Sequence, residues 1–138
     1  MALYLADTSA WHRSGRDPTV REWWSDRLLR GELAVCSPVR LVLLYSARGR
    51  DDYESLRDDL AGLPQLPMDA AAARRAEDVQ GLLAVRSQHR GPSPFDLYIS
   101  AVAELNGATL LHYDRHFDAV GRVTGQSMQW LAPRGTLD

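Results

Sequence analysis

Short apolar runs alternate with amphipathic segments along the chain. Five runs are expected to form strands: Leu3–Ala6, Leu33–Cys36, Gln65–Met68, Ala108–Tyr113 and Ser127–Leu131. Helical spacing of apolar residues predicts helices between them, at Pro18–Gly31, Ser37–Gly49, Asp51–Leu60, Ala70–Gln88, Phe95–Asn106 and Asp114–Val120. Strands that are separated by helices favour a mainly parallel sheet covered on both faces. The pattern therefore predicts an α/β protein with three layers, α/β/α.

Polar residues and glycines mark where these helices begin and end. Asp7 can cap a helix after the first strand, and Asp69 can cap the alanine-rich helix. Ser37 followed by Pro38 predicts a helix start in which the serine is the cap. Gly107 suits a C-terminal cap, because glycine adopts left-handed backbone angles easily.

The length of 138 residues suits a single domain over residues 1–138, with a loose tail after about Pro133. No stretch approaches the ~18 consecutive apolar residues of a membrane span. The start MALYLADTSAW lacks the pattern of a signal peptide. We therefore expect a cytoplasmic protein. Cys36 is the only cysteine, which excludes an intrachain disulfide and cysteine-rich zinc sites, and its apolar surroundings predict a buried side chain.

The basic residues are of one kind. All 16 are arginines, and the formal net charge is −2. A chain without lysine has neither a Walker-type phosphate loop nor a Schiff-base site. Because the net charge is negative, any contact with nucleic acid would depend on local groups of arginines.

Three aspartates occupy positions that an α/β topology can bring together. Asp7 follows the first strand, Asp114 follows the strand that ends at Tyr113, and Asp96 begins a helix. Taken singly, each has a structural explanation as a cap, a turn residue or a first-turn acid. Ligands of open α/β sheets bind at the carboxyl ends of the strands, and grouped carboxylates repel one another unless a cation binds them. Oxygen ligands suit Mg²⁺ or Mn²⁺, so the spacing makes a metal site an equal alternative to the structural explanations.

Four segments carry a more specific pattern: YLADTSAW, CSPVRLVLLYSAR, PFDLYISAVAELNGATLLHYD and the phenylalanine of HF. In this order and at this spacing they resemble the PIN-domain family, and within it the VapC-type toxins of type II toxin–antitoxin systems. The resemblance covers most of the chain. It implies a PIN-like fold and a metal-dependent endoribonuclease toxin that pairs with an antitoxin protein, cleaves RNA and forms a homodimer.

The resemblance also assigns roles to individual residues. Asp7, Asp96 and Asp114 match the acids of the family, and they would be the catalytic residues and the ligands of Mg²⁺ or Mn²⁺. Ser9 or Thr8 would supply a hydroxyl that supports the site. A bound ion of this kind activates water and stabilises the leaving oxygen of a phosphodiester.

Two positions depart from the family pattern. Val42 in RLVLLYSAR stands where a glutamate is usual, and His116 stands where an aspartate often precedes the phenylalanine. Val42 removes one charge and one ligand from the implied metal site, so we expect impaired activity. Natural decay, deliberate inactivation and a spontaneous change that permitted expression would each leave this valine. For His116, a surface role is favoured over a substitute ligand or a phosphate contact.

Predictions about RNA contacts rest on proximity in the sequence. Arg13, Arg16, Arg40 and Arg115 lie nearest the matching motifs and are the candidates for contact with the RNA backbone. Each is also an ordinary surface charge when it is considered singly.

For several large side chains, a structural role is the primary interpretation. The helix that begins at Pro18 has a broad apolar face with Trp23 and Trp24, which predicts core packing. A groove for an antitoxin segment is the alternative, because tryptophan is enriched among interface anchors. His12 and His112 are interpreted as packing or capping residues rather than as an acid/base pair.

Other classes of protein remain alternatives. A catalytically decayed PIN module would bind an antitoxin or RNA without cleaving, and Val42 favours it. A phosphoaspartyl phosphotransferase also has an aspartate after its first strand, but these enzymes usually need a lysine. The haloacid-dehalogenase kind further needs a second aspartate where this chain has Ser9. A flavodoxin-like nucleotide binder would need a glycine-rich first turn, which DTSAW is not.

Overall fold

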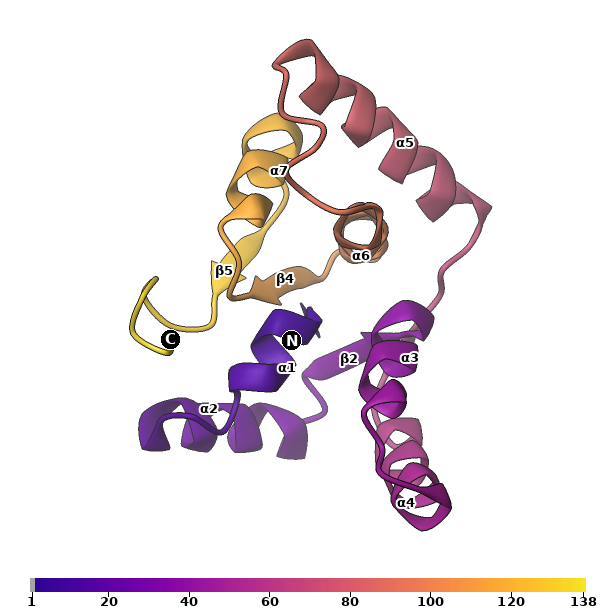
Figure 1. Cartoon of the computed structure of the whole chain (residues 1–138), viewed down its shortest axis with the longest axis vertical. Coiled ribbons are helices and arrows are strands. Elements are labelled where there is room, and N and C mark those ends of the chain that lie inside the picture. The colour runs from indigo at the N-terminus through magenta and orange to yellow at the C-terminus, as the bar shows by residue number, and fades with distance from the viewer. Residues whose placement is uncertain (1) are drawn as a thin grey trace.

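The predicted strands form one sheet in the computed structural model, which describes residues 2–138 (Figure 1). They are β1 (Tyr4–Ala6), β2 (Leu33–Cys36), β3 (Gln65–Leu66), β4 (Thr109–His112) and β5 (Met128–Trp130). Their order is β3-β2-β1-β4-β5, and every neighbouring pair is parallel. The predicted α/β fold is therefore confirmed. Strand order reverses between β1 and β4, and their carboxyl ends flank the crevice where such sheets bind ligands.

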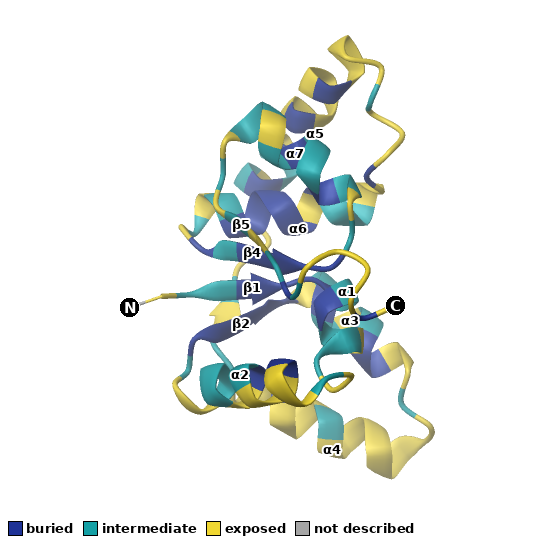
Figure 2. Cartoon of the chain, turned by 90° about the vertical axis from the view of Figure 1, so that its left-hand side faces the viewer, coloured by how far each residue is buried: buried dark blue, intermediate teal, exposed yellow. Residues whose placement is uncertain are grey.

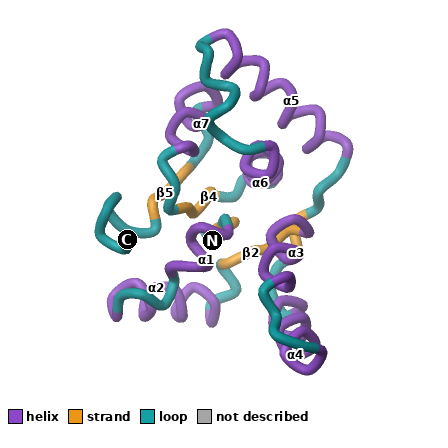
Figure 3. Tube along the Cα trace, viewed as in Figure 1, coloured by secondary structure: helices purple, strands orange, loops and turns teal. Residues whose placement is uncertain are grey.

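In the described part of the chain, seven helices connect and cover these strands (Figure 3). They are α1 (Thr8–Arg13), α2 (Pro18–Leu29), α3 (Ser37–Tyr45), α4 (Arg50–Ala61), α5 (Ala70–Val85), α6 (Pro94–Leu105) and α7 (His116–Thr124). Within residues 2–138, none of them is long and apolar enough to cross a membrane.

Helices cover the sheet on both faces. Because successive strand residues point to opposite sides, neighbouring residues enter different cores. Leu5 and Leu110 belong to a core cluster with residues of α3, α5, α6 and α7. Their neighbours Ala6 and Leu111 belong to a second cluster with residues of α1, α2 and the C-terminal tail. Figure 2 shows β1, β2 and β4 buried between these layers, whereas α4 is mostly exposed. Continuous apolar runs in the strands are the sequence counterpart of this double coverage.

The helix after β2 differs from its prediction at both ends. Cys36 is the N-cap residue, Ser37 is already helical, and no side chain caps the helix. The helix ends at Tyr45 instead of near Gly49, because the Ser46 N–H and the Ser46 Oγ both donate to the Leu43 carbonyl. A side chain that binds its own turn in this way competes with helix continuation.

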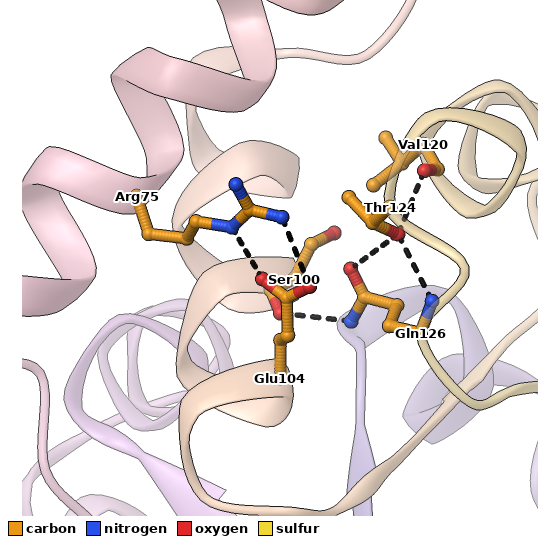
Figure 4. A network of polar contacts seen from close by, with 6 residues as sticks. All are labelled: Arg75, Ser100, Glu104, Val120, Thr124 and Gln126. Atoms are coloured by element: carbon orange, nitrogen blue, oxygen red, sulfur yellow. Dashed lines mark hydrogen bonds and ion pairs between the residues drawn. The ribbon is translucent and has the colours of Figure 1, made fainter.

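Polar contacts fix α6 between α5 and α7 (Figure 4). Arg75 Nε and Nη2 of α5 donate to the two carboxylate oxygens of Glu104 on α6, at 2.6 and 3.1 Å. Gln126, which follows α7, donates to the Ser100 carbonyl of α6 at 2.9 Å, and its own N–H donates to Thr124 Oγ1. These contacts position the helix that carries Asp96.

The C-terminal tail contacts the second core cluster through Leu137, while residues 133–136 are exposed. Leu137 is only 6% exposed. Its N–H donates to the Tyr113 hydroxyl at 2.9 Å, and its carbonyl accepts from Arg16 Nη1 at 2.8 Å. The apolar side chain completes the cover of a sheet face that α1 and α2 leave partly open.

Candidate active site

Asp7 lies at the carboxyl end of β1 and caps α1. Its Oδ2 accepts from the Ser9 N–H at 3.0 Å and from Ser9 Oγ at 2.6 Å. Its Oδ1 is buried and has no hydrogen-bond partner within residues 2–138, and the residue is 3% exposed. Burial raises the pKa of the Asp7 carboxyl, and the nearby charge of Asp96 raises it further. One oxygen is thus fixed by the cap, while the other is left without a partner.

Ser9 joins the ends of the two central strands. Besides its bonds to Asp7, its hydroxyl accepts from the Tyr113 N–H, directly after β4, at 2.9 Å. Of the two hydroxyls proposed for this role, that of Ser9 contacts the carboxylate, whereas Thr8 contributes through its backbone.

Asp96 is held at the first turn of α6 by a reciprocal capping box. The Ser93 N–H donates to Asp96 Oδ2 at 2.9 Å, and the Asp96 N–H donates to Ser93 Oγ at 3.1 Å. Burial raises the pKa of Asp96, as does the charge of Asp114, while His116 acts in the opposite direction. Asp96 therefore interacts electrostatically with both of the other acids.

Asp114 follows β4 and lies in the turn before α7. Its Oδ1 accepts from the His116 N–H at 2.9 Å, and its own N–H donates to His112 Nδ1 at 3.3 Å. The residue is half-buried. Asp7 and Asp114 thus follow the neighbouring strands β1 and β4, and Asp96 interacts electrostatically with each of them, although the three acids are widely spaced in the chain.

The acids provide only part of what a site for a divalent cation needs. Among residues 2–138, no three His, Cys, Asp or Glu side chains lie close enough together to hold a metal ion. The donor chemistry nevertheless suits Mg²⁺, because Asp7 presents an unpartnered, buried carboxylate oxygen beside a second carboxylate. The acids therefore form an incomplete set of hard oxygen donors.

Val42 lies on α3, which contacts both α1 and α6. It is half-buried, but it belongs to neither hydrophobic core cluster, whereas Val39, Leu43 and Leu44 of the same helix pack into the core. A core role does not account for this valine. Val42 thus lies on a helix that contacts both α1, which Asp7 caps, and α6, which carries Asp96.

The surroundings of His12, His112 and Cys36 bear on the roles that were predicted for them. His112 is buried between Phe117 and Trp130, with ring centroids 5.0 Å away on each side, and burial lowers its pKa. His12 is exposed. Burial raises the pKa of the Cys36 thiol to about 11, so this side chain stays protonated at neutral pH. The predicted packing role of His112 is confirmed, and so is the burial of Cys36.

The apolar face of α2 is mainly a core face, as expected. Val20 and Trp24 are buried in the second core cluster. The Trp24 ring meets that of Trp11 edge-on at 4.9 Å between centroids, and Trp23 meets Tyr4 at 5.4 Å. Packing therefore explains these tryptophans without a partner.

Three of the four arginines proposed to contact RNA already donate hydrogen bonds to other residues of the chain. Arg13 donates to the Ser9 carbonyl at 3.2 Å and lies over the Tyr113 ring, and Arg16 donates to the tail. Arg40 donates to Gln65 Oε1 at 3.2 Å. Arg115 is exposed and makes no side-chain hydrogen bond or ion pair among the described residues.

Sequence reasoning missed two further arginines near this site, Arg122 and Arg134. Both line an open groove that also contains Arg115 and His116. Arg122 follows Arg115 by seven residues, which is two helical turns, so helical spacing was a usable signal for it. No local pattern indicated Arg134, because a turn of the tail brings it to the groove.

Comparison with known proteins identifies the family. Residues 4–123 match the PIN domain family. Ribonuclease VapC18 of Mycobacterium tuberculosis is 42% identical over 137 residues, which cover 98% of this chain and 99% of the relative.

Solved structures share the fold at lower identity. DNA-bound VapBC from Salmonella typhimurium has a TM-score of 0.70 at 20% identity, covering 96% of this chain and all of the other. VapBC-5 from Mycobacterium tuberculosis, a member of the VapBC family of toxin–antitoxin systems, has a TM-score of 0.62 at 23% identity, covering 94% and 98%. The topology, the family match and the identity to VapC18 agree: this chain belongs to the PIN-domain family and, within it, to the VapC-type proteins.

Proposed function

We propose that this protein is a metal-dependent endoribonuclease toxin of a toxin–antitoxin pair, and that Val42 impairs its activity. The observation that carries the proposal is the convergence of Asp7, Asp96 and Asp114, in which Asp96 interacts electrostatically with both of the others. Burial raises the pKa values of Asp7 and Asp96, and two neighbouring carboxylates of this kind are a costly arrangement that a structural role does not require. The 42% identity to a protein named a ribonuclease supports the class of reaction.

Asp7, Asp96 and Asp114 would hold Mg²⁺ or Mn²⁺ in this proposal. Such an ion, when bound, makes water more acidic and neutralises charge on a phosphodiester. The chain's own contribution is rigidity: Ser9 fixes one oxygen of Asp7 and leaves the other free, and the Ser93 capping box orients Asp96. His116, which binds Asp114 only through its backbone N–H, would lie beside the substrate.

The proposed partners follow from the relatives. The two solved structures compared above are a DNA-bound VapBC and a member of the VapBC family of toxin–antitoxin systems. We therefore propose a cognate antitoxin protein as partner and RNA as substrate. A homodimer and a cytoplasmic location stay predictions.

A non-cleaving PIN module that binds an antitoxin or RNA is the second candidate. The absence of a closed trio of ligands among residues 2–138 favours it, as does Val42. The two candidates differ in one respect, which is whether restoring an acid at residue 42 restores hydrolysis.

Four proteins decide between them: this chain, Val42→Glu, Val42→Gln, and Val42→Glu combined with Asp7→Asn. Each is incubated with a mixed tRNA pool and Mg²⁺ or Mn²⁺, with and without EDTA, and Mn²⁺ binding is measured by calorimetry. Because an added carboxylate contributes both a ligand and a charge, Val42→Glu should bind Mn²⁺ and cleave RNA at least roughly 10-fold better than this chain. Val42→Gln controls for the size and polarity of the new side chain.

Cleavage by Val42→Glu that disappears with Asp7→Asn or EDTA would support the ribonuclease proposal. Equal inactivity of all four proteins on the pool, together with unchanged Mn²⁺ affinity, would contradict the assignment of residue 42 and favour the binding module.

A further inference from the structure

An open groove of about 430 Å³ lies between α7, the loop that follows α5 and the C-terminal tail. Three of the side chains that line it are exposed arginines: Arg115 and Arg122 of α7 and its cap, and Arg134 of the tail. Neutral polar residues, Ser87 and Gln88, line the opposite wall.

The groove carries uncompensated positive charge. Among residues 2–138, no ion pair or side-chain hydrogen bond engages Arg115, Arg122 or Arg134, whereas Arg27, Arg30, Arg50 and Arg75 are paired with acids. The acid in the groove, Asp118, accepts from Trp130 Nε1 at 3.1 Å and forms no ion pair with these arginines. Three guanidinium groups beside one carboxylate make a local cationic surface on a chain whose formal net charge is −2.

This surface adjoins the acidic site through His116. The side chain of His116 lines the groove, and its backbone N–H donates to Asp114 Oδ1 at 2.9 Å. The backbone of Gly91 packs against the same imidazole, since a Cβ at Gly91 would lie 3.3 Å from His116 Nδ1. The His116 side chain thus lines the groove, while its backbone N–H contacts Asp114 of the acidic site.

We propose that this groove is a phosphate subsite for RNA, in which Arg115, Arg122 and Arg134 bind backbone phosphates that flank the phosphodiester at the acids. The proposal rests on the proposed ribonuclease function and adds to it the path of the strand. Guanidinium groups bind phosphate oxygens in bidentate pairs and keep their charge at all physiological pH values. A strand with one phosphate at Asp96 and Asp114 continues past His116, where the next negative charges meet the arginines.

RNA fits the groove better than an acidic peptide does, because the cationic surface is continuous with a site suited to phosphodiester chemistry. The polar wall formed by Ser87 and Gln88 offers hydrogen bonds to ribose or base edges.

The test measures RNA binding without cleavage. Anisotropy of a dye-labelled oligouridine is recorded in EDTA over a range of KCl concentrations, for this chain, Arg122→Gln/Arg134→Gln, and the control Arg21→Gln/Arg74→Gln. The control removes two exposed arginines of α2 and α5 that lie outside the groove. Thermal melting monitored by circular dichroism checks that each variant folds.

The groove variant should bind about 10-fold more weakly at low salt. Its slope of log K against log[KCl] should be shallower by about 1.4, because single-strand binding loses about 0.7 for each phosphate contact removed. The control should match the unmodified chain. Equal losses in both double variants would reduce the effect to general charge and overturn the proposal.

Two further outcomes separate this proposal from others. If the groove variant loses affinity for a labelled polyglutamate peptide but not for oligouridine, the surface recognises an acidic protein segment and the RNA proposal is wrong. If the unmodified chain does not bind oligouridine, the groove proposal fails, while cleavage by Val42→Glu still decides the ribonuclease proposal independently.

Discussion

The carboxylate of Asp7 is an unfavourable group in a folded protein that holds no cation. It is almost fully buried, and among residues 2–138 only one of its oxygens accepts hydrogen bonds. Burial raises its pKa, and Asp96, whose pKa is also raised by burial, adds repulsion. Sites that bind cations keep such groups because function, rather than stability, needs them.

Replacing Asp7 by asparagine should therefore stabilise the protein at pH 7. We expect a gain on the order of 1 kcal/mol, or roughly 3 °C in Tm for a domain of this size. Asparagine keeps an acceptor for the Ser9 N–H and hydroxyl and removes the buried charge. Thermal melting in EDTA measures the difference, and a lower Tm for Asp7→Asn would show that the ionised carboxylate is structural.

The pH dependence of that gain has a definite sign. Because the folded pKa of Asp7 lies above its ordinary value of 3.8, the folded state binds the proton more tightly than the unfolded chain does. The penalty of the carboxylate is thus largest at neutral pH and falls as the pH drops through the raised pKa. The Tm difference between Asp7→Asn and this chain should shrink from pH 7 toward pH 4, and a constant difference would contradict the shift.

At the scale of elements, α6 is the helix whose capping and side-chain contacts position Asp96. Proline in the first turn, the reciprocal Ser93–Asp96 capping box and Gly107 after the last turn define its ends. The Arg75–Glu104 pair and the Gln126–Ser100 bond then fix it against its neighbours. Asp96 is therefore both a structural first-turn acid and a candidate ligand, and the two explanations are compatible.

Removing the cap hydroxyl with Ser93→Ala should lower the free energy of unfolding by about 1 kcal/mol, because the Asp96 N–H loses its acceptor. Urea denaturation followed by circular dichroism measures the change. Ser93→Thr keeps a hydroxyl at the same atom and serves as the matched control. Equal stability of the alanine and threonine variants would mean that the Ser93 hydroxyl contributes nothing to the stability of the fold.

At the scale of the whole molecule, the last residues complete the second core. Leu137 packs with residues of α1, α2, β4 and β5, and its main chain is bonded to Tyr113 and Arg16. Tyr113 also donates its N–H to Ser9, which holds Asp7. The C-terminus is thus linked to the acidic site through two intermediate residues.

A chain that ends at Thr136 should lose about 2 kcal/mol of stability, which is the worth of one buried leucine. Urea denaturation provides the measurement. A chain that ends at Leu137 removes only the exposed Asp138 and should keep full stability. If both truncated chains were equally stable, the packing of the tail would be incidental.

Local sequence determined much of this protein on its own. The order and type of the main elements, the caps at Asp7 and Asp69, and the left-handed glycine at 107 were predictable, because apolar periodicity and capping involve residues a few positions apart. The family also followed from short motifs in order. The placement of α3's ends did not, because Ser46 closes its own turn by a hydrogen bond that helix patterns do not reveal.

Only the tertiary structure decided which distant groups meet. It brought Asp7, Asp96 and Asp114 to the carboxyl end of the sheet, engaged Arg13, Arg16 and Arg40 within the chain, and buried Leu137. It also gathered Arg115, Arg122 and Arg134 at one groove. Each of these outcomes depends on strand order and on which apolar faces cover each other, and these are properties of the whole packed chain that no local pattern contains.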